Sequence, residues 1–162
     1  MSDGARYCWH IHACPAHSRF RETSTRENAI ECAKAIEDVR GWYWEETFPG
    51  LNPRKARKDY DAFNRQLFGE CPELALIKDI ADLAKHGGRL DRSDVKVKEI
   101  IGAGAGGILF VSGPPMGPSG PFRNMHESKP ECTLRVVLND GSEVPLPALL
   151  TRAMEYWRGI LL

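Results

Sequence analysis

The 162-residue sequence has no long apolar run, no net charge and no recognisable catalytic motif. A membrane-spanning helix needs about 18 or more consecutive apolar residues, and no stretch of the chain approaches that length, so we expect no membrane association. Lys and Arg together number 22, as do Asp and Glu, so no overall field attracts nucleic acid or an anionic surface. His10 and His12 interrupt the N-terminal segment YCWHIHAC, which argues against a secretory signal.

Cysteine is too sparse and too scattered for a disulfide framework. The five cysteines are an odd number spread along the chain, a usage that fits a reducing compartment. We therefore expect a cytoplasmic protein. Cys71 lies where a helix is expected to begin, a position that lowers the pKa of a thiol, but this position is the sole argument for a reactive cysteine.

The common catalytic signatures are missing as well. The chain has no G-x-S-x-G elbow, no lysine after a phosphate-binding glycine loop and no H-E-x-x-H pair. Gly102, Gly104 and Gly107 spell G-x-G-x-x-G, but the motif opens onto a short apolar run at 108–111 and then Pro114, and not onto a helix. We therefore predict a glycine hairpin loop between two strands and no dinucleotide site.

Apolar residues recur at three- and four-residue steps in the first half of the chain, which predicts helices over residues 23–40, 53–68 and 71–90. The last of these has the clearest end signal, Gly87 and Gly88. The first begins with a capping box formed by Ser24 and Glu27, and Gly41 is expected to end or loosen it.

The second half of the chain has the pattern of strands. Alternating side chains predict strands at 95–100, 133–138 and 143–146, and the short apolar run at 108–111 predicts another. Asn139-Asp140-Gly141 predicts a tight turn between the last two strands of the chain. The Pro- and Gly-rich residues 112–130 predict a mobile loop.

A helix is predicted to close the chain over residues 147–162. Its wide apolar face predicts a place in the core, with a homodimer interface as the alternative. Because helices and strands are segregated along the chain, we expect one α+β domain, in which N-terminal helices pack on a small antiparallel sheet and the C-terminal helix closes the core.

The most chemically suggestive cluster lies in residues 1–22, which we interpret as a strand or extended segment. A strand over residues 7–14 would place four side chains on one face, with a fifth close behind: Cys8, His10, His12, Cys14 and His17. Zinc favours these ligands, so a zinc site is one hypothesis. Their spacing matches no zinc-finger pattern, and an edge strand that merely uses these residue types is the alternative.

The helix predicted over residues 71–90 carries a row of polar residues opposite its apolar stripe. Asp82 and His86 are one turn apart and Asp79 precedes them, so the carboxylate of Asp82 could orient His86 as a general base, or the three could bind a metal. The alternative is ordinary pairing on a helix surface, with His86 near the helix C-terminus, where its charged form is favoured.

Four cations crowd the start of the helix predicted over residues 53–68: Arg54, Lys55, Arg57 and Lys58. The helix dipole favours anions at this end, so a phosphate-contacting patch is one interpretation and pairing with nearby carboxylates is the other. The aromatic residues 42–44 are close in sequence, and basic and aromatic side chains together suit a nucleic-acid surface. Zero net charge makes nucleic acid the weaker interpretation.

The first functional hypothesis is therefore a non-catalytic binding or accessory protein that acts through contacts with an unidentified protein partner. Its support is the lack of a catalytic motif, the predicted mobile loop and the apolar terminal helix. A small zinc-dependent enzyme or zinc-stabilised protein built on the N-terminal Cys/His cluster is the first alternative, and a nucleic-acid binder is the second.

Overall fold

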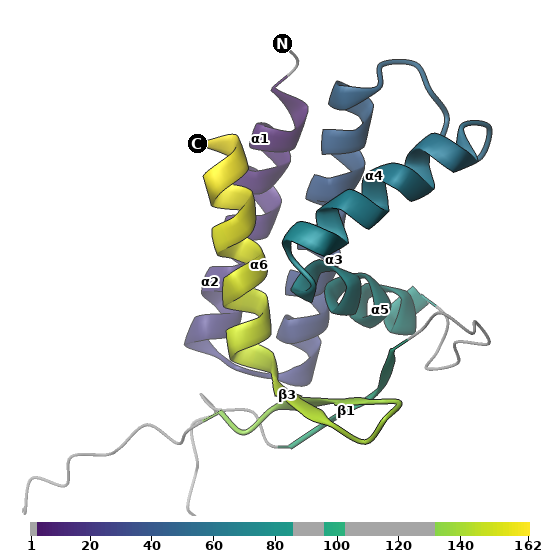
Figure 1. Ribbon diagram of the computed structural model, residues 1–162. Helices are drawn as coiled ribbons and strands as arrows, with labels where there is room; N and C mark the ends of the chain where they lie inside the picture. Colours follow the sequence, from purple (N-terminus) through teal and green to yellow (C-terminus); the bar gives the residue numbers. More distant parts are fainter. Residues whose placement is uncertain (1–2, 86–95, 103–131) are drawn as a thin grey trace, which may run out of the picture.

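The computed structural model describes residues 3–85, 96–102 and 132–162. Helices make up most of this part of the chain, and a small antiparallel sheet lies at one end of the helical layer (Figure 1). The predicted α+β class, with a C-terminal helix that closes the core, is confirmed. None of the described helices combines the length and the apolar character that a membrane span requires.

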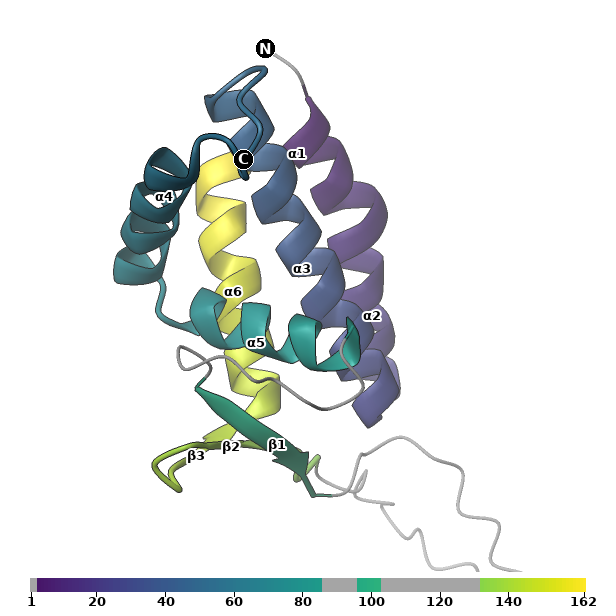
Figure 2. The same ribbon diagram turned by 90° about the vertical axis from the view of Figure 1, so that its right-hand side faces the viewer.

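The N-terminal segment is helical, so the strand predicted over residues 7–14 is wrong. α1 (Gly4–Cys8), a π-helical stretch (Trp9–Ala13) and α2 (Cys14–Glu22) follow one another without a break. The buried side chains recur at helical and not at alternating spacing: Ala5, Cys8, Trp9, Ala13, Ala16 and Phe20. This apolar stripe overrides the alternation of Cys and His because its side chains join the same core cluster as those of α3. Figure 2 shows the N-terminal helices lying alongside α3.

α3 (Arg26–Thr47) is longer than the sequence predicts, and the residue that caps its N-terminus is Thr25 and not the predicted Ser24. The hydroxyl of Thr25 accepts a hydrogen bond from the Asn28 amide at 3.1 Å, whereas Ser24 donates to the Phe20 carbonyl at 2.9 Å. Gly41 does not end the helix. A glycine costs a helix about 1 kcal/mol relative to alanine, and burial of Trp44 one turn later offsets that cost.

α4 (Arg57–Glu70) begins four residues later than the predicted start at residue 53, because residues 53–56 form a turn in which Asn52 Oδ1 accepts the Arg54 amide at 2.9 Å. α5 (Glu73–Lys85) confirms the predicted apolar stripe, since Leu74, Ile77 and Ile80 are buried. The predicted continuation of this helix through residues 86–90 lies outside the described residues.

The sheet consists of β1 (Val97–Ile101), β2 (Arg135–Leu138) and β3 (Glu143–Pro145), in that order and antiparallel throughout. The predicted turn is confirmed, with Gly141 at φ 83°. A bulge between Val97 and Glu99 breaks the predicted alternation of β1, so that Val97 and Ile100 are both buried. The predicted glycine loop beyond Gly102, the apolar strand predicted at 108–111 and the Pro/Gly-rich loop predicted over residues 112–130 lie outside the described residues.

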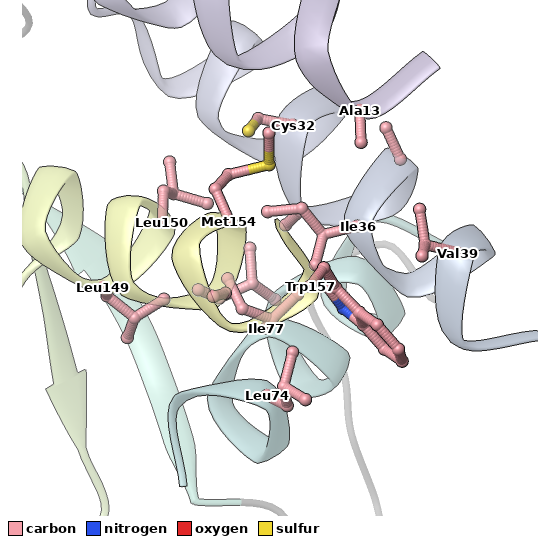
Figure 3. Packing of buried hydrophobic residues seen from close by; sticks show 14 of the residues in the cluster. Ala13, Cys32, Ile36, Val39, Leu74, Ile77, Leu149, Leu150, Met154 and Trp157 are labelled. Atoms are coloured by element: carbon pink, nitrogen blue, oxygen red, sulfur yellow. The ribbon is translucent and has the colours of Figure 1, made fainter. Parts of the chain in front are cut away.

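α6 (Leu146–Leu161) supplies the centre of the core, as its apolar face predicts. Figure 3 shows side chains of α6 packed against those of α3 and α5. They are Ile36 and Val39 of α3, Leu74 and Ile77 of α5, and Leu149, Leu150, Met154 and Trp157 of α6. α5 crosses α3 and α6 close to the sheet (Figure 2). Most of the apolar face of α6 is buried within the chain, as predicted, whereas Ile160 of the same face is 37% exposed. The alternative of a homodimer interface stays a prediction.

Candidate functional site

α4 is the helix that sits least deeply in the fold. Figure 2 shows it at the edge of the helical layer, beside α6. Phe63 and Leu67 are its buried residues, and the chain is hollowed on both sides of it. A helix that packs through a few large side chains leaves grooves along its flanks, and these grooves are the places where this surface can accept a ligand.

An aromatic cluster holds α4 against α3. The ring of Trp44 lies 5.2 Å from that of Phe63, 5.0 Å from that of Tyr60 and 4.3 Å from that of Phe48. The indole N–H of Trp44 donates to the Leu51 carbonyl at 3.1 Å, which ties in the loop before α4. Edge-to-face pairs of this kind contribute about 0.5–1.5 kcal/mol each beyond their buried area.

A buried cation makes the second link between these helices. Arg40 is 5% exposed, and its guanidinium donates from Nε to Glu37 Oε2 at 2.9 Å and from Nη1 to the side-chain oxygen of Asn64 on α4. It also lies over the ring of Tyr60, 5.3 Å from the centroid. Burial by itself lowers the pKa of Arg40, but the hydrogen bond and charge of Glu37 outweigh it and raise the pKa, so the cation persists inside the fold.

The first groove lies between α4 and α6, and we call it the α4–α6 groove. Its volume is about 310 Å³, and its apolar floor comes from Tyr43 and Phe48 of the α3 end, Phe63 of α4 and Ile160 of α6. Ile160 is 37% exposed, so part of the floor is open to solvent.

The polar side chains of the α4–α6 groove are acidic at both ends. Asp59 and Glu70 line it, and no Lys or Arg does so among the residues with assigned positions. Glu70 Oε2 accepts the hydroxyl of Tyr156 at 2.6 Å, and Oε1 accepts the Gln66 amide at 3.0 Å. These two hydrogen bonds lower the pKa of Glu70, whereas burial and the same contact raise the pKa of Tyr156. The groove therefore presents a charged carboxylate and a neutral phenol.

The helical N-terminus divides the residues proposed to bind zinc. Cys8 and His12 line a hollow beside Trp42, whereas His10, Cys14 and His17 line another beside α6. Over residues 3–85, 96–102 and 132–162, no three His, Cys, Asp or Glu side chains lie close enough together to hold a metal ion. The strand that would have gathered all five ligands does not exist.

Cys8 in this region and Cys71, which lies between α4 and α5, both sit in surroundings that favour the neutral thiol. Burial, with a smaller contribution from Asp38, raises the pKa of Cys8 to about 11. Burial, followed by a hydrogen bond to Glu73 at 3.4 Å, raises the pKa of Cys71 to about 11. The lowered thiol pKa expected for Cys71 from its place at a helix N-terminus is therefore wrong, because desolvation is the larger effect.

Of the proposed Asp82–His86 pair, the structure describes Asp82, whereas His86 lies outside the described residues. Asp82 accepts a hydrogen bond from Lys78, one helical turn earlier, at 3.1 Å. This is the ordinary ion pairing on a helix surface that the sequence offers as the alternative to a catalytic role. Asp79 has a role that the sequence did not reveal. It is 6% exposed and accepts the backbone amides of Lys96 at 2.8 Å and Val97 at 3.4 Å, so it fastens β1 to α5.

The four cations before and at the start of α4 are those of the nucleic-acid hypothesis, which stays a prediction: Arg54, Lys55, Arg57 and Lys58. All four are exposed, and Arg57 faces Asp61 at 3.8 Å. Arg57 alone of the four lines the hollow on the α5 side of the helix. Of the aromatic residues expected to assist them, Trp44 is buried and Trp42 is 47% exposed.

No protein-family model, curated protein or solved structure matches the chain. Function therefore has to be inferred from the geometry of the described side chains.

Proposed function

We propose that the protein is a non-catalytic binding module whose α4–α6 groove accepts an extended segment of a partner protein, in which an apolar residue lies between two basic ones. The observation that carries the proposal is the combination of an apolar floor with carboxylates at both ends. An apolar anchor in such a pocket supplies affinity, and charges at the rim supply selectivity.

The separation of the two carboxylates favours a peptide over a small molecule. Asp59 and Glu70 are eleven residues apart on one helix, which corresponds to about 16 Å at 1.5 Å per residue. An extended chain covers this distance in about five residues. A segment with Lys or Arg about five positions apart and a Leu, Ile or aromatic residue between them matches the groove at all three points.

The carboxylates are available for such a partner. In the described part of the chain neither Asp59 nor Glu70 forms an ion pair. Glu70 is held in place by the hydroxyl of Tyr156, so binding a cation costs little ordering of this side chain. Two of the aromatic rings of the floor, those of Tyr43 and Phe63, lie 6.1 Å apart, and their packing against Trp157 and Trp44 holds the floor rigid.

A displayed library of random peptides tests the proposal directly. The library is selected on the full chain, and enriched peptides are labelled and titrated by fluorescence anisotropy. We expect enrichment of an apolar residue flanked by Lys or Arg. Each exposed ion pair contributes about 0.2–1 kcal/mol, so Asp59→Asn with Glu70→Gln should weaken such peptides about twofold to thirtyfold.

Matched variants separate the groove from the rest of the surface. Ile160→Lys places a cation on the apolar floor and should abolish binding of the basic peptides. Ile11→Lys is the control, because Ile11 is 51% exposed on the N-terminal helix and does not line the groove. Enrichment of acidic or purely polar peptides, or of peptides that bind the Ile160→Lys variant unchanged, would contradict the proposal.

A further inference from the structure

The second groove beside α4 lies on the face towards α5, and we call it the α4–α5 groove. It has a volume of about 510 Å³. Cations stand on both of its walls: Arg57 and Arg65 on α4, Lys78 on α5 and Lys96 just before β1. The four come from segments far apart in the sequence, so no run of basic residues announces the site.

Two of the four cations of this groove are paired with carboxylates, Arg57 with Asp61 and Lys78 with Asp82, the latter at 3.1 Å. Asp61 faces Arg57 at 3.8 Å in a solvent-exposed pair, and Asp79 is turned inward to the backbone amide of Lys96 at 2.8 Å. Exposed pairs of this kind are weak and readily exchange partners. Over the described ranges, the side chains of Arg65 and Lys96 form no ion pair. The groove therefore has positive charge available to an anionic ligand.

Aromatic side chains lie along the same groove. Tyr60 and Phe68 line it from α4, and both are partly exposed. Tyr60 is fixed from behind, because the buried guanidinium of Arg40 lies over its ring and Trp44 packs edge-on against it at 5.0 Å. A fixed aromatic ring in a positively charged groove is the arrangement on which unpaired bases stack.

We propose that the α4–α5 groove binds single-stranded nucleic acid. The spacing of the cations favours a strand over a free phosphate, since Arg57 and Arg65 are eight residues apart on α4, about 12 Å along its axis. One phosphate group cannot reach both positions, whereas successive phosphates of a strand can. The aromatic rings favour a single strand over a duplex, in which the bases stack on one another and their faces are covered.

The test is a titration of the full chain against fluorescein-labelled oligonucleotides of about 12 nucleotides, followed by anisotropy. A single strand of mixed sequence is compared with the duplex of the same sequence, at about 50 mM and about 200 mM salt. We expect the single strand to bind more tightly than the duplex, with an affinity that falls steeply as salt rises. Equal or tighter binding of the duplex would overturn the proposal, as would no binding at the lower salt concentration.

Charge-matched variants identify the site. Arg65→Gln with Lys96→Gln should lower the salt dependence of log K by about 1.4, since each phosphate contact of a single strand contributes about 0.7. Arg26→Gln with Lys34→Gln removes the same charge from exposed positions of α3 that do not line the groove, and should leave affinity nearly unchanged. An equal loss in both double variants would reveal non-specific attraction and refute the site.

Two further measurements test whether a base stacks on Phe68 and whether the groove is only a site for a free anion. Phe68→Leu keeps an apolar side chain but removes the ring face, and should weaken the single strand at least fivefold, roughly the lower limit for one stacked base. Unchanged affinity would contradict base stacking. Complete displacement of the strand by inorganic phosphate at the same ionic strength would show a simple anion site and overturn the proposal. Circular dichroism checks that each variant is folded.

Discussion

Replacement of Arg40 by methionine should destabilise the fold by about 3–5 kcal/mol, the usual cost of leaving one member of a buried ion pair without the other. The side chains of Arg40 and Glu37 are 6% and 13% exposed, so water cannot solvate the carboxylate that remains. Asn64 also loses a donor, and the ring of Tyr60 loses the cation above it. These groups lie where α3 meets α4, so the loss falls on the attachment of α4.

The magnitude separates this pair from an ordinary surface pair. Arg19 and Glu31 also face each other across two helices, at 3.9 Å, but their side chains are 56% and 61% exposed. Arg19→Met should therefore cost less than about 1 kcal/mol. A domain of this kind is stable by about 5–15 kcal/mol, so both variants should remain folded in the absence of denaturant.

A double variant tests whether the cost comes from the stranded charge. Replacing a buried pair with apolar residues of similar size is often close to neutral, so Arg40→Met with Glu37→Leu should recover most of the lost stability. The free energies of unfolding come from urea titrations followed by tryptophan fluorescence, and hydrogen exchange over residues 57–70 reports the attachment of α4. A cost below about 1 kcal/mol for Arg40→Met, or a double variant as unstable as the single one, would refute the reasoning.

Three further predictions follow from single contacts. Asp79→Ala should cost about 2–3 kcal/mol in urea unfolding and speed amide exchange at the start of β1, because two backbone amides lose their acceptor; unchanged exchange there would contradict the assigned role. Gly102→Ala should lower the melting temperature more than Gly50→Ala, because both have positive φ but only at Gly102 would the new Cβ clash with the Thr133 carbonyl. Since the native pKa of Cys8 is raised from 9.0 to about 11, stability that is complete below pH 9 should be lost as the pH rises to about 11, and this loss should be smaller in Cys8→Ala.

The elements that periodicity predicts well are those whose apolar stripe is long and unambiguous. α5 and α6 each repeat their apolar residues over several turns, and the Asn139–Gly141 turn has a sequence typical of a two-strand hairpin. The strand predicted at the N-terminus is wrong because residues 7–14 alternate between two sets of residue types, although buried residues at helical spacing run through the same segment. Alanine at positions 5, 13 and 16 is a weak hydrophobic signal, and its meaning becomes clear only when α3 is there to pack against it.

The sites were harder to predict than the helices, because each groove is assembled from segments that are distant in sequence. Arg54, Lys55, Arg57 and Lys58 are predicted as phosphate contacts because they crowd the start of one predicted helix, yet only Arg57 of the four lines the α4–α5 groove. Lys78 and Lys96 do line it, and they are brought there by the packing of α5 and by the bond from Asp79 to β1. No local pattern carries that information.

Zero net charge is a property of the whole chain, and at the level of the sequence it argues against nucleic acid. At physiological ionic strength charges are screened over about 8 Å, so a ligand in a groove responds to the side chains around it and not to the balance of the whole chain. α4 divides two such environments, one lined by the carboxylates of Asp59 and Glu70 and the other by four cations and two carboxylates that are already engaged. Both depend on the Arg40 contact that holds α4 in place. If the two proposals hold, Arg40→Met should weaken the peptide and the oligonucleotide together, whereas a substitution confined to one wall, such as Ile160→Lys, should affect the peptide alone.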